Sequence, residues 1–460
     1  MEKNIVKVIK FGGDCLNGSK NILKAVQIIM SEKSFPVVVV SAMEGMTDLL
    51  INGIDKAKGK ETNVSDTISA LTEYHYNIAQ ESIKNDKVFN KTIQNITVLI
   101  KKVERLLYGV CYTEEITDAV RAYILSYGER ISASIISGVL EDNGTQSNVV
   151  ETDKIGLITD DDFENATVDL EEFKRNFNFL AHNIYNSGVI PIFTGFFGST
   201  PDGKVTTFGR GGADYTASVI AFGFDATELE IWRLDNGFTS ADPDIVENTN
   251  VIEKLSYFEA AELTYFGKKN LHPLTIEPIA PLEIPISVKN LLEPKNKGTL
   301  IVQDAYIEEN IVKSISQNEN ISMIRIHGTG IGYKPGLIRN IGDALSASKI
   351  NIFATVSSQT TINLLIENKD AEDALEILNS FKGKIIEKID FVRNIALIAV
   401  IGEGLLKKRG IFGRILNSIS HEKVNVEMAS AGASEVAIYI IVPKDELKEV
   451  INALHKEFIG

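Results

Sequence analysis

A repeated segment in the last third of the sequence constrains the fold more than any other feature. Residues 321–330 read ISMIRIHGTG and residues 395–404 read IALIAVIGEG, so the two segments match at a constant offset of 74 residues. Gly336 pairs with Gly410 at the same offset. Each copy reads strand, glycine turn, helix, strand, strand and helix, which is the order of a β-α-β-β-α-β module. The sequence therefore predicts two small modules of one fold, and a repeat kept only for dimerisation is the alternative.

The first 300 residues alternate short apolar runs with longer amphipathic segments. The runs at 37–40, 189–193 and 229–232 are β-branched or aromatic and flanked by breakers, which is typical of buried parallel strands. Such alternation predicts an α/β sandwich with a mostly parallel sheet, whose ligands lie at the carboxyl ends of the strands. Residues 60–125 are polar and helix-prone, and we expect them to form a helical excursion on the substrate side of the cleft.

Composition excludes several classes of protein. A chain of 460 residues predicts two or three domains, and a net charge of -15 argues against a nucleic-acid or anionic-membrane partner. Two cysteines, Cys15 and Cys111, allow neither a disulfide framework nor a four-cysteine zinc site. The sequence shows no signal peptide and no apolar stretch of about 18 residues, so we expect a cytoplasmic protein without a membrane partner.

Two glycine loops each carry a single cation. A strand-like run at 5–9 leads into Lys10, Phe11, Gly12 and Gly13, and residues 207–216 read TFGRGGADYT. Neither loop is a P-loop or a dinucleotide-binding fingerprint. Glycines let the backbone approach a phosphate closely, and a following helix can present its N-terminal amides to it. The loops therefore predict anion binding, and the alternative for Lys10 is a lysine that snorkels at the surface.

These loops, the SAM string at 41–43, the YGER string at 127–130 and the repeated modules together resemble the aspartate kinases of the amino-acid-kinase family over essentially the whole chain. The resemblance implies an amino-acid-kinase-like catalytic domain at 1–305, followed by ACT-like regulatory modules at 306–390 and 391–460. It also implies that the γ-phosphoryl group of Mg-ATP is transferred to the β-carboxylate of L-aspartate, giving 4-phospho-L-aspartate. That carboxylate has a reference pKa of about 3.9 and needs no general base, so positioning and charge neutralisation must do the catalytic work.

The resemblance also implies roles for individual residues on the substrate side. Lys10 matches a lysine that contacts the transferring phosphoryl group. Arg210 would grip the α-carboxylate with its two-pronged guanidinium, while Glu129 and Asp214 face the α-ammonium. A pure N-cap role for Asp214, in front of a helix beginning near Tyr215, is the alternative.

The remaining candidates come from the same resemblance. Ser41 and Thr47 match hydroxyls near the substrate carboxylates, and Lys269 in FGKKNLHP matches a lysine that neutralises phosphate charge and joins Lys10 and Asp214 as a catalytic candidate. No metal ligand is predicted within the protein. The predicted nucleotide-binding residues are Gly12, Gly13, Trp232, Asp242 and Lys269.

The nucleotide side departs from the family pattern. Where the family has a W-T-D-V-x-G strand end and a T-x-D-P-R turn, this chain has Arg233 and Leu234 after the tryptophan, and Asp244 after D-P. The loss of two polar contacts could cost roughly 1 kcal/mol each. Three interpretations follow: an active aspartate kinase with a weaker or different nucleotide pocket, a regulatory paralogue that partners an active subunit, or a kinase for another amino acid or carboxylate.

The two predicted ACT-like modules also differ from each other. The second keeps an S-x-G-x-S-E string whose Ser434 and Glu435 are candidates for effector or interface contacts. The first has lost the acidic residue, so we expect weak or no inhibition by an amino-acid effector such as lysine or threonine. Exposed edge strands of small sheets are satisfied by pairing across a twofold axis, which predicts a homodimer or a dimer of dimers assembled through these modules.

Overall fold

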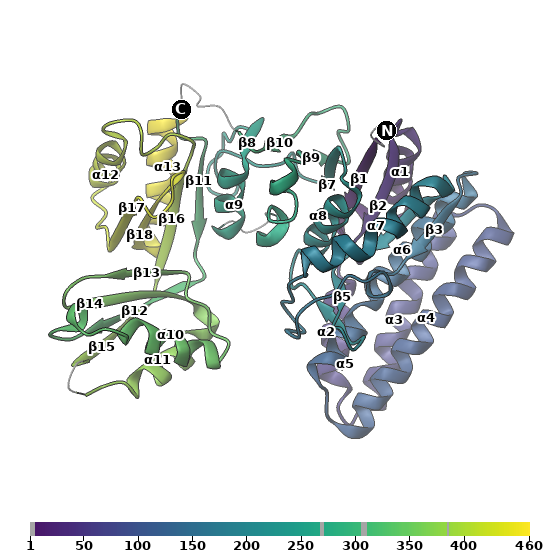
Figure 1. Ribbon diagram of the computed structural model, residues 1–460, viewed down its shortest axis with the longest axis horizontal. Helices are drawn as coiled ribbons and strands as arrows, with labels where there is room; N and C mark the ends of the chain where they lie inside the picture. The colour runs from purple at the N-terminus through teal and green to yellow at the C-terminus, as the bar shows by residue number, and fades with distance from the viewer. Residues whose placement is uncertain (1–4, 267–270, 305–310, 384–385) are drawn as a thin grey trace. The chain divides into compact units, whose positions relative to one another are not determined.

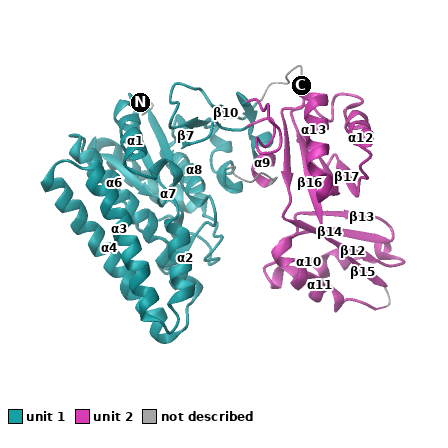
Figure 2. Ribbon diagram, turned by 180° about the vertical axis from the view of Figure 1, so that it is seen from behind, with its two compact units in different colours: residues 1–238, 251–261, 270–305 teal, residues 239–250, 262–269, 306–460 magenta. Residues whose placement is uncertain are grey.

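The computed structural model describes residues 5–266, 271–304, 311–383 and 386–460 (Figure 1). They form two compact units, each with its own sheets and core (Figure 2). The first unit contains residues 1–238, 251–261 and 270–305, and the second contains residues 239–250, 262–269 and 306–460. None of the helices in the described part of the chain has the length and apolarity that a membrane crossing needs.

The first unit is built on an eight-stranded sheet with the order β3-β4-β2-β1-β7-β9-β10-β8. Every neighbouring pair of these described strands runs parallel except β9 with β10, which confirms the predicted mostly parallel sheet. A separate hairpin is made by β5 (Phe197–Ser199) and β6 (Val205–Thr207). The strands of the sheet are β1 (Val6–Phe11), β2 (Phe35–Val40), β3 (Ser147–Val150), β4 (Ile190–Thr194), β7 (Glu228–Arg233), β8 (Lys254–Ser256), β9 (Ile286–Asn290) and β10 (Thr299–Val302).

Helices cover both faces of this sheet. On one face, α1 (Ser19–Ser31) and α6 (Tyr127–Asp142) pack against Ile9 and Phe11 of β1. On the other face lie α7 (Leu170–Ser187) and α8 (Gly212–Phe224). A helical layer outside α6 contains α2 (Met46–Ala57), α3 (Glu61–Ser82), α4 (Asp86–Thr113) and α5 (Asp118–Leu125) (Figure 1).

The layer outside α6 confirms the helical excursion predicted for residues 60–125. Helix α4 shows why these polar residues form helices. Its buried residues, including Ile96, Ile100, Val103 and Leu107, recur every three or four positions, and the side chain of Asn85 accepts hydrogen bonds from the first free amides. The polar composition therefore reflects one narrow apolar stripe on an otherwise solvated helix.

The second unit contains two four-stranded antiparallel sheets, in the orders β13-β14-β12-β15 and β11-β16-β18-β17. Each sheet buries one face under two helices of its own repeat. The elements are β11 (Ser314–Asn318), β12 (Ile321–His327), α10 (Leu337–Ala347), β13 (Ala354–Ser357), β14 (Thr361–Glu367), α11 (Ala371–Asn379), β15 (Lys388–Val392), β16 (Ile395–Ile401), α12 (Ile411–His421), β17 (Met428–Ala431), β18 (Ala437–Pro443) and α13 (Leu447–Phe458).

The first repeat has the predicted β-α-β-β-α-β order, from β12 to β15. The second repeat ends after α13, and its fourth strand is β11, which precedes the first repeat and pairs with β16. We therefore propose that the first module occupies about 321–392, inserted between β11 and β16, in place of the simple division at 390.

A second departure from a linear division lies at 239–250. Ala241 and Val246 of this segment pack in the core of the second repeat, and the Ser240 hydroxyl lies 2.9 Å from Nε2 of His455 in α13. Helix α9 (Tyr257–Phe266) likewise begins in the first unit and continues into the second. Residues before 305 thus contribute to the second unit.

Candidate active site

Lys10 and Asp214 form a buried ion pair at the carboxyl edge of the parallel sheet. Lys10 lies near the end of β1 and Asp214 lies in the first turn of α8, with 2.6 Å between Nζ and Oδ1. The side chains are only 8% and 7% exposed, so Lys10 does not snorkel into solvent. Helix α8 begins at Gly212 with Gly211 as its N-cap, and the pure capping role considered for Asp214 is therefore wrong. Its carboxylate turns to the lysine instead.

The turn formed by Gly12 and Gly13 packs too closely for larger residues. The Gly12 N–H donates to the Trp232 carbonyl oxygen at 3.2 Å, which ties the turn to the end of β7. A Cβ on Gly13 would lie 2.7 Å from the carbonyl oxygen of Ala42, and backbone atoms cannot move aside cheaply. Glycine is needed here because it brings the turn against the segment that follows β2, where Ser41 begins the SAM string.

Glu129 is buried beside this turn with half of its carboxylate unused. It lies in the first turn of α6 and is 3% exposed. Its Oε1 accepts a hydrogen bond from the Ala42 N–H at 2.9 Å, while Oε2 has no hydrogen-bond partner among the described atoms. Burial raises the pKa of Glu129 to about 8, although the Ala42 amide and the charges of Arg130 and Lys10 act in the opposite direction. A ligand cation facing Oε2 would favour the ionised form.

Arg210 lies in the exposed loop before α8, near the start of α2. Its side chain is 98% exposed, and its closest ionic partner is Asp48 in the first turn of α2, at 3.9 Å. A pair this exposed and this long contributes little, so the guanidinium is free to exchange it for a ligand carboxylate. Thr47 precedes Asp48 in the same turn, which places it at the start of α2.

The structure thus brings together the substrate-side and phosphate-side candidates of the first unit. They come from the ends of β1 and β2 and from the starts of α2, α6 and α8. The assembled residues are Lys10, Gly12, Gly13, Ser41, Thr47, Glu129, Arg210 and Asp214.

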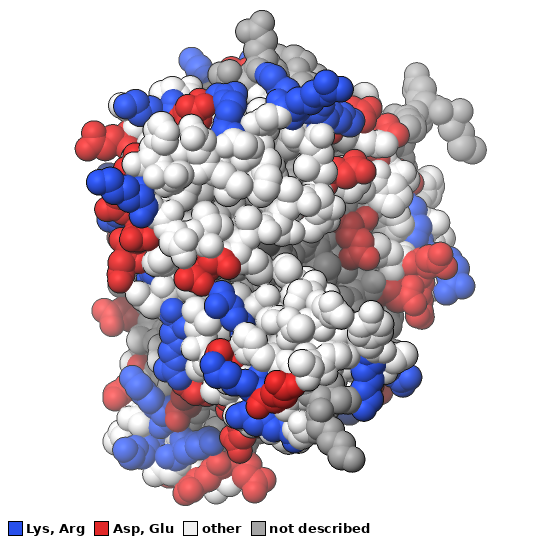
Figure 3. Space-filling model, turned by 90° about the vertical axis from the view of Figure 1, so that its left-hand side faces the viewer, with Lys and Arg blue, Asp and Glu red and all other residues white. Residues whose placement is uncertain are grey.

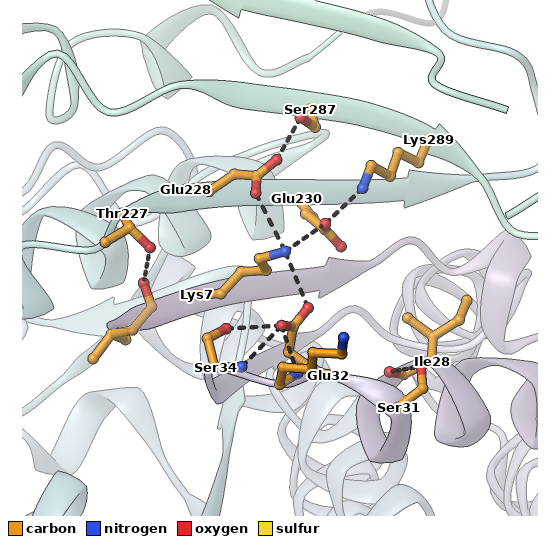
Figure 4. Close-up of polar contacts among 12 residues, drawn as sticks. Lys7, Ile28, Ser31, Glu32, Ser34, Thr227, Glu228, Glu230, Ser287 and Lys289 are labelled. Atoms are coloured by element: carbon orange, nitrogen blue, oxygen red, sulfur yellow. Dashed lines mark hydrogen bonds and ion pairs between the residues drawn. The ribbon is translucent and has the colours of Figure 1, made fainter. Parts of the chain in front are cut away.

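Trp232 is held in place by a buried charge network. Its indole Nε1–H donates to Oε2 of Glu230 at 2.9 Å, and the ring is 3% exposed, so its packing serves the sheet. Oε1 of Glu230 receives the ammonium groups of Lys7 at 3.1 Å and Lys289 at 2.6 Å (Figure 4). Figure 4 also shows Glu228 and Glu32 reaching the same Lys7 ammonium. Sequence reasoning missed Glu230, because a lone acidic residue in a strand gave no signal.

Leu234, one of the departures from the family pattern, is bonded to Asp14, which follows the glycine turn. Oδ2 of Asp14 accepts a hydrogen bond from the Leu234 N–H at 3.1 Å, and Oδ1 accepts from the Cys15 N–H at 2.9 Å. Arg233 pairs with Asp235 at 3.1 Å. The altered residues therefore form a connected structure between the glycine turn and β7.

The remaining predicted site residues do not belong to this group of side chains. Asp242 belongs to the second unit, where its carboxylate accepts from the Asp244 N–H and from the side chain of Gln317. Lys269 lies outside the described residues. Ser434 and Glu435 follow β17, Glu435 being exposed and the Ser434 hydroxyl accepting from a backbone N–H at 3.3 Å.

Metal binding by the protein alone has little support among the residues described. No group of three or more His, Cys, Asp and Glu side chains there is arranged to hold an ion. Mg²⁺ in nucleotide sites is bound through one or two carboxylates together with substrate phosphates and water. Asp214 supplies a carboxylate at this site, and its Oδ1 is the atom paired with Lys10, so its other oxygen fits an ion that arrives with a nucleotide.

Comparison with known proteins places this geometry in a family. Residues 6–290 match the amino acid kinase family. The chain belongs to the amino acid kinase family. Residues 316–380 and 398–458 each match an ACT domain. The predicted fold class, an amino acid kinase domain followed by two ACT modules, is therefore confirmed.

Relatives of this amino acid kinase share its whole length. It is 29% identical to aspartokinase 1, chloroplastic, of Arabidopsis thaliana, over 99% of this chain and 81% of the relative. It is 30% identical to the bifunctional aspartokinase/homoserine dehydrogenase of Buchnera aphidicola, over 98% of this chain and 56% of the relative. The chain thus spans little more than half of that bifunctional protein.

Solved structures show the same fold. Aspartokinase III of E. coli, in complex with aspartate and ADP, matches with a TM-score of 0.88 and 23% identity over 99% of this chain and 100% of that one. Aspartate kinase of Clostridium acetobutylicum matches with a TM-score of 0.73 and 26% identity over 98% of this chain and 100% of that one.

Proposed function

We propose that this amino acid kinase transfers the γ-phosphoryl group of ATP to the β-carboxylate of L-aspartate. The observation that carries the proposal is the buried Lys10–Asp214 pair beside the Gly12-Gly13 turn, with the half-satisfied carboxylate of Glu129 nearby. A phosphoryl transfer to a carboxylate needs a fixed cation at the transferring group and firm positioning of an already ionised acceptor. Lys10 can supply the cation, and Arg210 and Glu129 can supply the positioning, without a general base. The names of the relatives, aspartokinases in plants and bacteria, support the same activity.

Each side chain of the site has a role in this scheme. Lys10 stabilises the charge on the phosphoryl oxygens, and its pairing with Asp214 fixes its direction. Arg210 binds the α-carboxylate of aspartate, and Oε2 of Glu129 receives the α-ammonium. These contacts hold the β-carboxylate in line with the phosphoryl group.

Nucleotide binding involves the segment that differs from the family pattern. Mg²⁺, when bound with ATP, neutralises charge on the phosphates, and Asp214 is the carboxylate that would face it. Lys10 would hold the phosphates, and the glycine turn would let the backbone approach them closely. The hydrogen bond from the Leu234 amide to Asp14 ties the end of β7 to the glycine turn beside this segment.

The test is an assay of ADP release with ATP, Mg²⁺ and candidate acceptors. Aspartate-dependent release is expected, with glutamate and acetate much poorer. Release with another amino acid but not with aspartate would refute the proposed acceptor. No release with any acceptor, together with retained aspartate binding, would favour the regulatory paralogue.

We also propose that the ACT modules form a homodimer and the regulatory part of the protein. Strands β13 and β17 lie at edges of the two described sheets, and residues 350–366 and 428–434 contain no charged side chain. Figure 3 looks onto the side of the second unit and shows broad areas free of charged side chains. Edge strands without charges or prolines are unprotected against pairing with another copy. We keep the expectation of weak inhibition by lysine or threonine, with Ser434 and Glu435 as interface contacts.

A further inference from the structure

His272 makes two hydrogen bonds that define its tautomer. The Leu274 N–H donates to Nδ1 of His272 at 3.2 Å, so Nδ1 is an acceptor and carries no proton. Nε2 lies 2.8 Å from the carbonyl oxygen of Phe208 and must therefore be the donor. Burial lowers the pKa of His272, which agrees with a neutral ring that satisfies both partners.

The same side chain contacts both ends of the glycine loop that carries Arg210. Phe208 is the first residue of the loop, and its carbonyl accepts the Nε2 hydrogen bond. At the other end, the imidazole stacks on Tyr215, with 5.6 Å between ring centroids and 22° between planes. A Cβ on Gly211 would lie 3.5 Å from Cβ of His272, so the loop rests against the histidine. His272 thus spans the loop from its first residue to the first turn of α8.

Arg210 contributes little to holding this loop in place. Its side chain is 98% exposed, and its pair with Asp48 is 3.9 Å long. Two left-handed glycines, Gly209 and Gly211, flank it and make the backbone conformationally permissive. The position of the guanidinium therefore depends on contacts at the ends of the loop.

We propose that His272 is a positioning residue for aspartate binding, fixing the 208–211 loop so that Arg210 meets the α-carboxylate in one place. The proposal rests on the proposed function for the role of Arg210. The Nε2–H bond to the Phe208 carbonyl is the contact that acts on the loop, while the Nδ1 bond to Leu274 only shapes the turn after His272. A loosened loop must be ordered when aspartate binds, and that cost appears in the KM for aspartate.

Two matched substitutions separate the bonds. His272→Gln keeps a donor near the position of Nε2, and His272→Asn keeps an acceptor near the position of Nδ1. We expect His272→Asn to raise the KM for aspartate about tenfold, the usual effect of one lost hydrogen bond, with the KM for ATP nearly unchanged. His272→Gln should stay within about twofold of the native value by the same reasoning. Equal KM values for aspartate in the two variants would overturn the proposal.

A second readout does not depend on activity. Trypsin cleaves after arginine only where the backbone can open locally, so its cleavage after Arg210 reports the freedom of the loop. Cleavage after Arg210 should be faster in His272→Asn than in His272→Gln, with similar melting temperatures for both. If the native protein failed to phosphorylate aspartate, the proposed function would fail. The cleavage rates would still test whether His272 holds the 208–211 loop. Equal cleavage rates would show that His272 does not hold the loop.

Discussion

Lys10 carries the charge that the proposed transfer requires, so its removal is a direct test of the site. Lys10→Ala should lower kcat by roughly a hundredfold or more, because a fixed cation at the transferring group is lost. The folded state should persist, as judged by circular dichroism. Lys20→Ala, on the exposed face of α1, is the charge-matched control and should leave kcat unchanged. A Lys10→Ala enzyme with native kcat would place the chemistry elsewhere.

Arg210 should contribute to binding and little to chemistry. Arg210→Ala should raise the KM for aspartate about tenfold or more with a modest change in kcat, provided that binding equilibrates before transfer. The side chain is 98% exposed, so the melting temperature should not change. An unchanged KM for aspartate would contradict the assigned role.

The raised pKa of Glu129 predicts that aspartate binding releases a proton. Because burial raises its pKa to about 8, the carboxyl is mostly protonated at pH 7, and an incoming α-ammonium would favour its ionised form. Aspartate binding at pH 7 should therefore release close to one proton, measured by titration calorimetry in two buffers with different ionisation enthalpies. The release should vanish in Glu129→Gln and above about pH 9, where the carboxyl is already ionised. Proton uptake at pH 7 would contradict this role for Glu129.

The same raised pKa also affects stability. The Glu129 carboxyl keeps its proton in the folded protein at pH values where the unfolded chain has already lost it. The resulting contribution to the free energy of unfolding is therefore complete below the ordinary pKa of glutamate. It is lost as the pH rises through about 8. Aspartate should therefore protect the protein against heat more strongly at pH 8 than at pH 6.

At the residue scale, the sequence indicated candidate site residues, and it did not indicate which residues they contact. Lys10, Glu129 and Asp214 could be proposed because each stands in a string with glycines or aromatic residues that resembles a known family. The Asp14 to Leu234 contact could not, because its partners are far apart in sequence and one of them is a backbone amide. In the sequence, His272 stands out only as a histidine beside a proline. That pattern does not distinguish a residue that positions the substrate-binding loop from a purely structural one.

At the scale of elements, three neighbouring strands share the charges drawn in Figure 4. Glu230→Gln should destabilise the first unit by about 1.5 to 3 kcal/mol, because it removes the carboxylate shared by Lys7 and Lys289, while Lys7 keeps Glu32 and Glu228. Urea unfolding can be followed by fluorescence of Trp232, the single tryptophan of the chain, which bonds to Glu230 itself. The control is Glu228→Gln, a residue 26% exposed, which should cost about 1 kcal/mol or less. Equal losses in the two variants would show that the network does not depend on Glu230.

The order of elements was predictable from sequence, while their pairing was only partly so. Periodicity gave the alternation before residue 300 and the repeat after it, since both are local patterns. The pairing of β11 with β16 joins segments on either side of a whole module, and no local pattern encodes such a contact. The packing of Ala241 and Val246 in the second repeat was hidden for the same reason.

At the scale of the whole molecule, the uncharged edges of the ACT sheets predict the assembly. Truncation near residue 305 is a poor test, because Ala241 and Val246 would lose the core in which they pack.

Thr355→Lys in β13 together with Ser430→Lys in β17 keeps the chain whole. If copies pair across a twofold axis, each new lysine lies near its counterpart, and like charges across strands are destabilising. Light scattering should then show a fall from a multiple of 50.6 kDa to the monomer mass. Ser346→Lys, on the exposed surface of α10, adds one lysine away from the edges and should leave the dimer intact. A double edge variant that kept the native mass would show that the copies associate through another surface.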